Sequence, residues 1–306
     1  MPHFAVIVAV HNEEGNIPLL FKRLSNVFDK EMKQSFDLWV IDDGSTDETA
    51  KTVSDLASKN KNIHLIKLSR NFGHHNALFA GLEHANNADY YITMDGDLQH
   101  RPEDIPKLYN ELKSGYEMVY AARKNHKAVS KTFWTLVGAL SEQKMENDQS
   151  IFRIFSKKFR DAVLIPGDYH KFFAGLFSWV GFKTGSLEIE HDKRYSGSSK
   201  YTFIKQLKQA IDAVTGFSAH PLRFITYGGI LISCLAFLLG LTLIFMRFYA
   251  SPPPGWTFIM TTIFFALGVQ MVSLGVIAEY IGKMFSQVQN RPYYIVDEII
   301  NGSKTQ

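Results

Sequence analysis

Two aspartates, Asp95 and Asp97, follow directly after an apolar run that is rich in β-branched and aromatic residues. That run predicts a buried strand, and Gly96 between the two carboxylates allows the backbone to bend so that both converge on one cation. The side-chain oxygen of Gln99 is a candidate third ligand. Ligation by oxygen alone favours Mg²⁺ or Mn²⁺ over zinc. The alternative for an isolated Asp-Gly-Asp is an ordinary solvated turn.

Further polar clusters end two earlier apolar runs. Asn12 and Glu13 follow the first run of the chain, and Asp42 and Asp43 end the second. If the runs are parallel strands of one sheet, the three clusters lie along a single rim. A cation at that rim would bridge phosphate oxygens, while other carboxylates would accept hydrogen bonds from ribose hydroxyls and a base N–H. The pattern therefore predicts a site for a nucleotide diphosphate.

The elements that must position these clusters alternate between strand and helix patterns. Strands are expected over residues 4–10, 36–41, 63–68, 90–94 and 118–121, with later candidates at 150–155 and, at the edge of the sheet, 185–189. Helical patterns separate the first five. Such alternation implies a mostly parallel sheet with right-handed crossovers, whose ligands bind beyond the carboxyl ends of the strands. We therefore expect an α/β domain over residues 1–199.

Composition and missing motifs exclude several classes. The formal charge of +3 over 306 residues is too small to argue for nucleic acid, and the one cysteine, Cys234, allows no intrachain disulfide. The first ten residues lack the pattern of a signal peptide. Neither a phosphate-binding Gly-x-x-x-x-Gly-Lys loop nor a Gly-x-Gly-x-x-Gly fingerprint occurs, which disfavours kinase-like and nicotinamide-type activities. Scattered histidines, expected to be structural or surface residues rather than zinc ligands, are His74, His75, His84, His100 and His126.

The last third of the chain carries two long apolar segments. Ile225 to Phe245 and Trp256 to Ala278 contain no charged residue, and each is long enough to cross a hydrocarbon core of roughly 30 Å. We expect transmembrane helices at about 225–248 and 256–281, within a membrane region over 221–282. The alternative is a buried hairpin in a soluble protein.

Basic residues are more frequent at the outer ends of this hairpin than in its connecting loop. By the positive-inside rule, the α/β domain, both termini and a tail at 283–306 are expected to be cytoplasmic, in a multi-pass protein of the bacterial inner membrane. Residues 200–220 form an amphipathic pattern immediately before the first apolar segment. We expect a juxtamembrane helix there that lies at the bilayer surface, and the alternative is a helix packed on the protein core.

Five motifs together resemble a known family. They are Val8-Ala9-Val10-His11-Asn12-Glu13, Ile41-Asp42-Asp43-Gly44-Ser45-Thr46-Asp47, Ser69-Arg70-Asn71-Phe72-Gly73, Met94-Asp95-Gly96-Asp97-Leu98-Gln99-His100-Arg101-Pro102-Glu103 and Gly197-Ser198-Ser199-Lys200-Tyr201. The chain resembles the family 2 glycosyltransferases of GT-A fold. Within them it is more similar to the polyprenyl-phosphate branch, which includes dolichyl-phosphate mannose synthase and the bacterial polyprenyl-phosphate glucosyltransferases. The resemblance extends over nearly the whole chain.

The resemblance implies roles for matched positions. Donor-binding residues would be Val10, Asn12, Glu13, Asp42, Asp43, Arg70 and Asp95. The divalent cation, Mg²⁺ or Mn²⁺, would be held by Asp95, Asp97 and Gln99. The acceptor phosphate would be bound by Arg123, Arg194, Ser199 and Lys200, and catalytic roles would fall to Asp97, Asp148, Arg123 and Arg153.

One position departs from the family pattern. Many relatives place an acidic residue directly before the Phe152-Arg153 pair, where this chain has Ile151, and the nearest carboxylate is Asp148. A strong general base is not required if the acceptor is a lipid phosphate, because a phosphate monoester has its second pKa near about 6 and is largely anionic at pH 7. The site must instead hold two anions together, which calls for a metal and several basic side chains.

The activity expected from the resemblance is inverting transfer of one sugar from a nucleotide-diphosphate sugar to polyprenyl phosphate at the cytoplasmic membrane face. A UDP-sugar is favoured over a GDP-sugar, and a homo-oligomer is compatible with the sequence. One alternative is a processive polysaccharide synthase, although its Gln-x-x-Arg-Trp motif and additional membrane helices are missing from the sequence. Another is a non-catalytic scaffold subunit that binds nucleotide, against which the intact Asp95, Asp97 and Gln99 triplet argues. A transporter is disfavoured by two spans without intramembrane charge.

Overall fold

The computed structural model describes residues 1–123, 150–169, 171, 173–189, 220–249 and 255–302. The chain divides into two compact units. The first contains Met1–Thr135, Met145–Thr202 and Arg291–Gln306, and the second contains Leu136–Lys144 and Phe203–Asn290. The amphipathic helix expected at 200–220 lies almost entirely outside the described residues.

The first unit is built on one sheet with the strand order β7-β5-β6-β4-β1-β2-β3-β8. Its strands are β1 (His3–Val10), β2 (Ser35–Asp42), β3 (Ile63–Leu68), β4 (Tyr90–Asp95), β5 (Met118–Arg123), β6 (Arg153–Ser156), β7 (Thr184–Ile189) and β8 (Val296–Asn301). The four strands β4, β1, β2 and β3 are parallel neighbours, and β5 pairs in parallel with β7. Only β6 and β8 pair antiparallel among the described strands. This arrangement confirms the expected α/β fold with a mostly parallel sheet.

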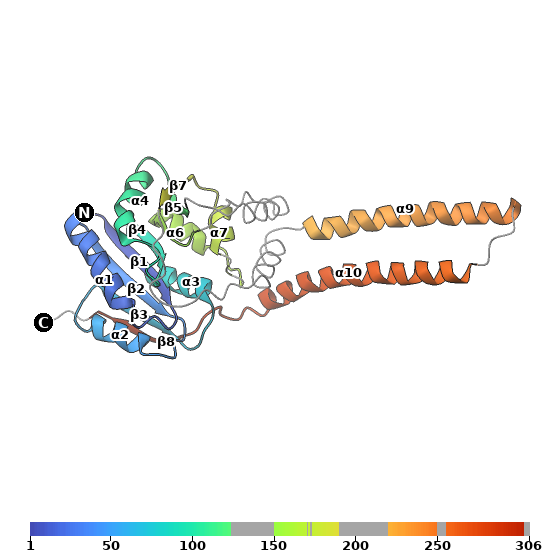
Figure 1. Ribbon diagram of the computed structural model, residues 1–306. Helices are drawn as coiled ribbons and strands as arrows, with labels where there is room; N and C mark the ends of the chain where they lie inside the picture. The colour runs from blue at the N-terminus through green and yellow to red at the C-terminus, as the bar shows by residue number, and fades with distance from the viewer. Residues whose placement is uncertain (124–149, 170, 172, 190–219, 250–254, 303–306) are drawn as a thin grey trace. The chain divides into compact units, whose positions relative to one another are not determined.

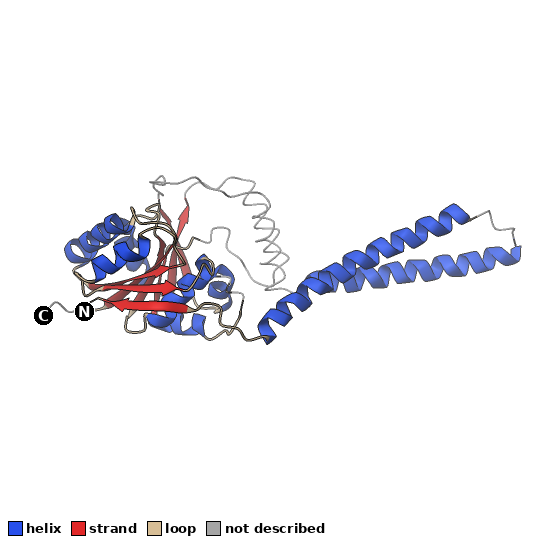
Figure 2. Cartoon of the chain, turned by 90° about the horizontal axis from the view of Figure 1, so that it is seen from below, coloured by secondary structure: helices blue, strands red, loops and turns tan. Residues whose placement is uncertain are grey.

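Helices cover both faces of this sheet (Figures 1 and 2). They are α1 (Ile17–Asn26), η1 (Val27–Met32), α2 (Thr49–Ala57), α3 (His74–His84), η2 (Pro102–Asp104), α4 (Ile105–Leu112), α6 (Lys157–Leu164) and α7 (Phe173–Trp179).

Side chains alternate between the two faces along each strand. Val6 and Val8 of β1 belong to the same buried cluster as Leu20 of α1 and Leu108 of α4. On the opposite face, Ile7 packs against α3. The period of two in β1 therefore supplies both apolar layers of the unit.

Strand positions agree with expectation to within three residues. Residues 63–68 form a strand with the expected bounds, and β7 lies at one edge of the sheet as expected. The other edge holds a strand that the sequence analysis did not anticipate. Residues 296–301, assigned there to a tail, form β8 and pair with β3.

The second unit contains two long helices that contact each other, α9 (His220–Tyr249) and α10 (Trp256–Val288). Within the described residues, one stretch, Phe265–Val288, is long and apolar enough to cross a membrane, and none of it is buried. A shorter apolar stretch, Leu222–Ile232, lies in α9. Large apolar side chains exposed on the two helices include Phe224, Tyr227, Leu231, Leu235, Phe258, Phe265, Met271 and Phe285.

Candidate functional site

Three parallel strands end next to one another on one side of the sheet. In the strand register Val10 pairs with Asp42, and Ala9 pairs with Asp95. We call the ends of β1, β2 and β4, together with the turns that follow them, the rim. The structure thus brings the predicted acidic clusters to one edge, as the alternation of elements implied.

Asp43 is the anchor of a neighbouring loop. Its two carboxylate oxygens accept hydrogen bonds from the backbone amides of Phe72 and Gly73, at 2.7 and 3.0 Å. Burial raises the pKa of Asp43, although these two bonds oppose the shift. The residue is only 3% exposed and both of its oxygens accept loop amides, so Asp43 holds the loop of Phe72 and Gly73 at the rim.

Asp42 differs from its neighbour in having an oxygen to spare. Its Oδ1 accepts the backbone amide of Ser45 at 3.0 Å. Its Oδ2 is buried and has no hydrogen-bond partner among the described residues. A buried acceptor without a partner typically costs about 1–3 kcal/mol, so this oxygen is a candidate for binding a ligand N–H.

Asn12 joins the turns after β1 and β2. It adopts a left-handed backbone conformation with φ of 60°, which Asn tolerates better than most residues. Its side-chain Oδ1 accepts the backbone amide of Thr46 at 2.8 Å, and its backbone amide donates to Ser45 Oγ at 2.9 Å. The neighbouring Glu13 carboxylate accepts a hydrogen bond from the Asn16 side chain. Asn12 therefore acts on the rim by holding two turns together.

The turn after β4 is folded tightly back against β1. A Cβ on Gly96 would lie 2.7 Å from Val10 Cγ1, so a larger residue would force the turn outward. Leu98 takes a left-handed φ of 64°, and Asp97 Oδ1 accepts the amide of Gln99 at 3.1 Å. These contacts fix the Asp-Gly-Asp turn at the rim, which counts against a freely solvated turn.

Asp95 contacts two imidazoles. Its Oδ1 lies 3.1 Å from His74 Nε2, and its backbone amide donates to His100 Nδ1 at 3.1 Å. His100 is buried and its ring stacks on Phe152 at 5.2 Å. Burial alone would raise the pKa of Asp95, but the bond from His74 and the charges of the nearby histidines outweigh it and hold the pKa far below its usual range.

The residues of this turn fit a hard divalent cation. Asp95, Asp97 and Gln99 offer carboxylate and amide oxygens, the donor set of Mg²⁺ and Mn²⁺ rather than of zinc. The Asp95 side chain remains one third exposed (33%). No group of three or more His, Cys, Asp or Glu side chains suited to a metal occurs in the described part of the chain. A cation here would therefore depend on two carboxylates and an amide.

Arg153, for which the resemblance implies a catalytic role, is buried at the start of β6, with 3% of the residue exposed. Its Nε donates to the carbonyl of Ser150 at 2.7 Å. The guanidinium carbon lies 5.2 and 4.9 Å from the ring centroids of Phe173 and Phe177. Burial, and then the charges of His74 and Arg153, lower the pKa of His75 to about 4. Arg153 thus packs among aromatic rings and leaves a positive field near α3.

The remaining predicted residues are distributed as follows. Arg70 is exposed, with its guanidinium 4.0 Å from the Phe72 ring centroid. Arg123 ends β5 opposite Ile189. Outside the described residues lie Asp148, Arg194, Ser199 and Lys200.

The sequence analysis expected His74 and His100 to be structural or surface residues and did not anticipate their contacts with Asp95. Both contact Asp95, one from the first residue of α3 and the other from the turn after β4. The spacing of His100, five residues after Asp95, was an available signal. His74 offered no such signal because its approach to Asp95 depends on how α3 packs on the sheet.

Comparison with known proteins identifies the family. Residues 5–181 match the model of glycosyl transferase family 2. The chain therefore belongs to that family.

Relatives match over almost their full length. An uncharacterized glycosyltransferase of Synechocystis is 33% identical over 96% of this chain and 95% of its own. The SfII prophage-derived bactoprenol glucosyl transferase of Shigella flexneri is 32% identical over 98% of this chain and 99% of its own. The undecaprenyl-phosphate 4-deoxy-4-formamido-L-arabinose transferase of Proteus mirabilis is 30% identical over 98% of this chain and 94% of its own.

Solved structures with the same fold are more distant in sequence. Glucosyl-3-phosphoglycerate synthase from Mycobacterium tuberculosis, in complex with phosphoglyceric acid, superimposes with a TM-score of 0.51 at 19% identity. The match covers 70% of this chain and 79% of the synthase. The same synthase has been solved with Mn²⁺, UDP and glucosyl-3-phosphoglycerate.

Proposed function

We propose that this chain transfers a single sugar from a nucleotide-diphosphate sugar to polyprenyl phosphate at the cytoplasmic face of a membrane, with inversion at the anomeric carbon. The observation that carries the proposal is the meeting of Asp42 and Asp95 at one rim in a family 2 chain. Relatives that match along nearly their whole length are named for bactoprenol and undecaprenyl-phosphate transfer. We favour a UDP-sugar over a GDP-sugar as the donor.

Asp42 is proposed to recognise the nucleotide base. Its buried Oδ2 lacks a partner among the residues that the structure describes, and a base N–H would supply one. Uracil and guanine both carry such a donor. Asp43 would hold the loop of Phe72 and Gly73 beside the base through its two amide bonds.

Asp95, Asp97 and Gln99 are proposed to hold Mg²⁺ or Mn²⁺ next to the diphosphate. When bound, such a cation offsets the negative charge that the departing diphosphate gains. His74 contacts the Asp95 carboxylate from the helix side, and His100 accepts the Asp95 backbone amide from the turn side. The first contact orients the carboxylate and the second holds its backbone before a ligand arrives, which is the preorganisation that metal and phosphate sites need.

The reaction that we propose is one displacement. A phosphate oxygen of the lipid forms a bond to the anomeric carbon as the bond from that carbon to the donor diphosphate breaks. The products are a polyprenyl-phosphate sugar and a nucleoside diphosphate. The lipid phosphate is already ionised at neutral pH, so Asp148 is not required to remove a proton.

Three basic side chains and one hydroxyl are proposed to bind the acceptor phosphate. The basic residues are Arg123, Arg194 and Lys200, and Ser199 supplies the hydroxyl. Arg153 lies buried against Phe173 and Phe177. We therefore propose that it acts through its charge and its packing rather than by binding the phosphate directly.

The helices α9 and α10 are proposed to anchor the enzyme as a two-helix transmembrane hairpin, with residues 200–220 at the bilayer surface. Support comes from the exposed apolar stretch Phe265–Val288 and from the absence of charge between Arg223 and Arg247 in α9. Both termini and the α/β unit would then be cytoplasmic. The membrane would then supply the acceptor lipid.

The test uses purified full-length protein in detergent with a short polyprenyl phosphate, Mn²⁺ and a panel of UDP- and GDP-sugars. We expect mass spectrometry to detect one lipid carrying one hexose-sized addition, and an equal amount of free nucleoside diphosphate. Products with many sugars would favour a processive synthase. Nucleotide binding without any lipid product from any donor would favour a scaffold subunit.

A further inference from the structure

The chain returns to the sheet after α10 and contacts the end of α3. The hydroxyls of Tyr293 and Tyr294 donate to the two carboxylate oxygens of Glu83, the Tyr294 bond at 2.7 Å. Both rings are half-buried, and the ring of Tyr294 lies edge-on to His84. Burial, and then the bond to Glu83, raise the pKa of each tyrosine, so both hydroxyls keep their protons as donors at neutral pH.

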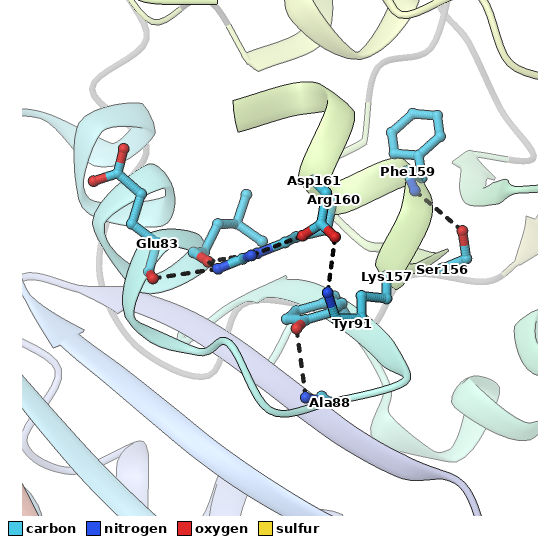
Figure 3. Close-up of polar contacts among 9 residues, drawn as sticks. Glu83, Ala88, Tyr91, Ser156, Lys157, Phe159, Arg160 and Asp161 are labelled. Atoms are coloured by element: carbon cyan, nitrogen blue, oxygen red, sulfur yellow. Dashed lines mark hydrogen bonds and ion pairs between the residues drawn. The ribbon is translucent and has the colours of Figure 1, made fainter. Parts of the chain in front are cut away.

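The end of α3 that carries Glu83 is fixed from the other side by Arg160. Its guanidinium donates to the carbonyl of Leu82 from Nε at 2.9 Å and from Nη2, and to the carbonyl of Glu83 at 3.2 Å (Figure 3). A cation at a helix C-terminus satisfies carbonyls that lack a helical partner. In Figure 3 the carboxylate of Glu83 points away from Arg160, which leaves it to the two tyrosines.

The opposite end of α3 lies at the rim. His74, the first residue of the helix, contacts Asp95 at 3.1 Å. Between the two ends, Gly81 allows α3 to lie directly on the sheet, since a Cβ there would come within 2.5 Å of Ile7 and Ile41. Close-packed interiors have low compressibility and transmit strain. A displacement of Glu83 is therefore expected to be transmitted along α3 to His74.

A second contact links the same C-terminal segment to the loop that precedes α3. The amide of Ser69 donates to the carbonyl of Ile295 at 3.0 Å. Ser69 begins the loop whose Phe72 and Gly73 amides bind Asp43. Residues 293–295 thus touch both the loop that precedes α3 and the end of that helix.

We propose that Tyr293, Tyr294 and Glu83 form a latch that positions the donor side of the rim, so that these three are positioning residues for nucleotide-sugar binding. The inference rests on the proposed function and adds a specific role for the end of the chain. None of the residues proposed to bind the acceptor phosphate belongs to the latch. Its loss should weaken donor binding and leave acceptor binding unchanged.

The experiment compares full-length wild-type protein with the double variant Tyr293→Phe/Tyr294→Phe in the same detergent. We expect the KM for the nucleotide sugar to rise about fivefold or more, the lower end of typical site-to-site couplings, and the KM for polyprenyl phosphate to stay within about twofold. Affinity for the nucleoside diphosphate with Mn²⁺, measured by calorimetry, should fall by the same factor as the donor KM rises. A purely structural defect would instead reduce the active fraction and change neither KM.

The matched control is Asp297→Asn, which removes the exposed Lys67–Asp297 ion pair of the same segment without touching α3. It should leave both KM values at wild-type levels. If the double variant does not fold, the single variants Tyr294→Phe and Glu83→Ala replace it. Combining these two should raise the donor KM by less than the product of their separate effects, because they break the same bond.

Two results would overturn the inference. An unchanged donor KM in folded latch variants would show that the latch does not act on the rim. A donor KM that rises equally in Asp297→Asn would show that any loosening of the segment has the same effect. If the wild-type protein itself binds no nucleotide and transfers no sugar, the proposed function fails, and this inference fails with it.

Discussion

The Nε2 atom of His74 lies 3.1 Å from Oδ1 of Asp95 and so joins the first residue of α3 to the last residue of β4. Burial acts to lower the pKa of His74, but the bond to Asp95 and the nearby carboxylates outweigh it and raise the pKa. The contact places an imidazole that favours its protonated form beside a carboxylate proposed to hold a cation. Donor binding should therefore depend on a residue outside the Asp-Gly-Asp turn.

Replacing His74 by alanine tests this dependence. The substitution removes a charge-assisted hydrogen bond of about 1.5–3 kcal/mol, so we expect kcat/KM for the donor to fall at least about tenfold. Steady-state kinetics at saturating lipid measure the effect. His3→Ala, at the amino-terminal end of β1, is the control and should keep wild-type kinetics. Equal kinetics in both variants would remove His74 from the site.

Asp42 and Asp43 are adjacent but should respond differently to the same substitution. Asp42→Asn changes a buried oxygen with no partner in the described chain, so nucleotide affinity should fall about tenfold while the melting temperature is retained. Asp43→Asn leaves one of two loop amides without an acceptor, so the melting temperature should fall as well. Calorimetric titration and thermal unfolding separate the two outcomes. A stable Asp43→Asn protein with normal affinity would contradict the anchoring role.

Glu103 and Arg23 should give a pH-dependent contribution to stability. Arg23 donates to both Glu103 oxygens, at 2.9 and 2.6 Å, and lowers the pKa of that carboxyl below 4.5. A lowered folded pKa contributes stability above the ordinary pKa and loses it as the pH falls through the lowered value. Because Glu103 is partly exposed, we expect Glu103→Gln to cost only about 0.5 kcal/mol at pH 7.

Thermal unfolding of wild type and Glu103→Gln from pH 7 to pH 3 measures this effect. The difference between their melting temperatures should shrink as the pH falls. Glu48→Gln, which removes an exposed pair with Lys51, should show no measurable difference at any pH. If the difference in melting temperature between wild type and Glu103→Gln grows as the pH falls, the ion pair is not its cause.

Gly81 should be required for the close packing of α3. An added methyl group would meet side-chain carbons of Ile7 and Ile41 at 2.5 Å, and overpacking of this kind usually costs about 1–3 kcal/mol. We therefore expect Gly81→Ala to lower the melting temperature and the donor affinity together. Gly167→Ala is the control, because no atom lies within 4 Å of its added Cβ and it lies outside the rim. An unchanged melting temperature in Gly81→Ala would show that α3 is packed less tightly on the sheet than the 2.5 Å contacts imply.

The sequence predicted local features better than tertiary contacts. Apolar runs located β3 to the residue and placed the Asp-Gly-Asp turn at the end of β4. The strand β8 was missed because Asp297 and Glu298 interrupt its apolar pattern and only pairing with β3 reveals it. The burial of Arg153 was also not predictable, since its contacts with Phe173 and Phe177 depend on how α7 packs. The assigned roles of the site residues remain predictions.

The most direct test of the account measures lipid-linked sugar by mass spectrometry with and without a divalent cation. Metal-stripped wild-type protein should form product with Mn²⁺ or Mg²⁺, lose it in excess chelator, and regain it when the cation is restored. Asp97→Ala should form none under any of these conditions, whereas Asp55→Ala, which alters an exposed carboxylate of α2, should match wild type. Full product yield in chelator, or from the Asp97→Ala protein, would contradict the claim that a cation at this rim supports the transfer.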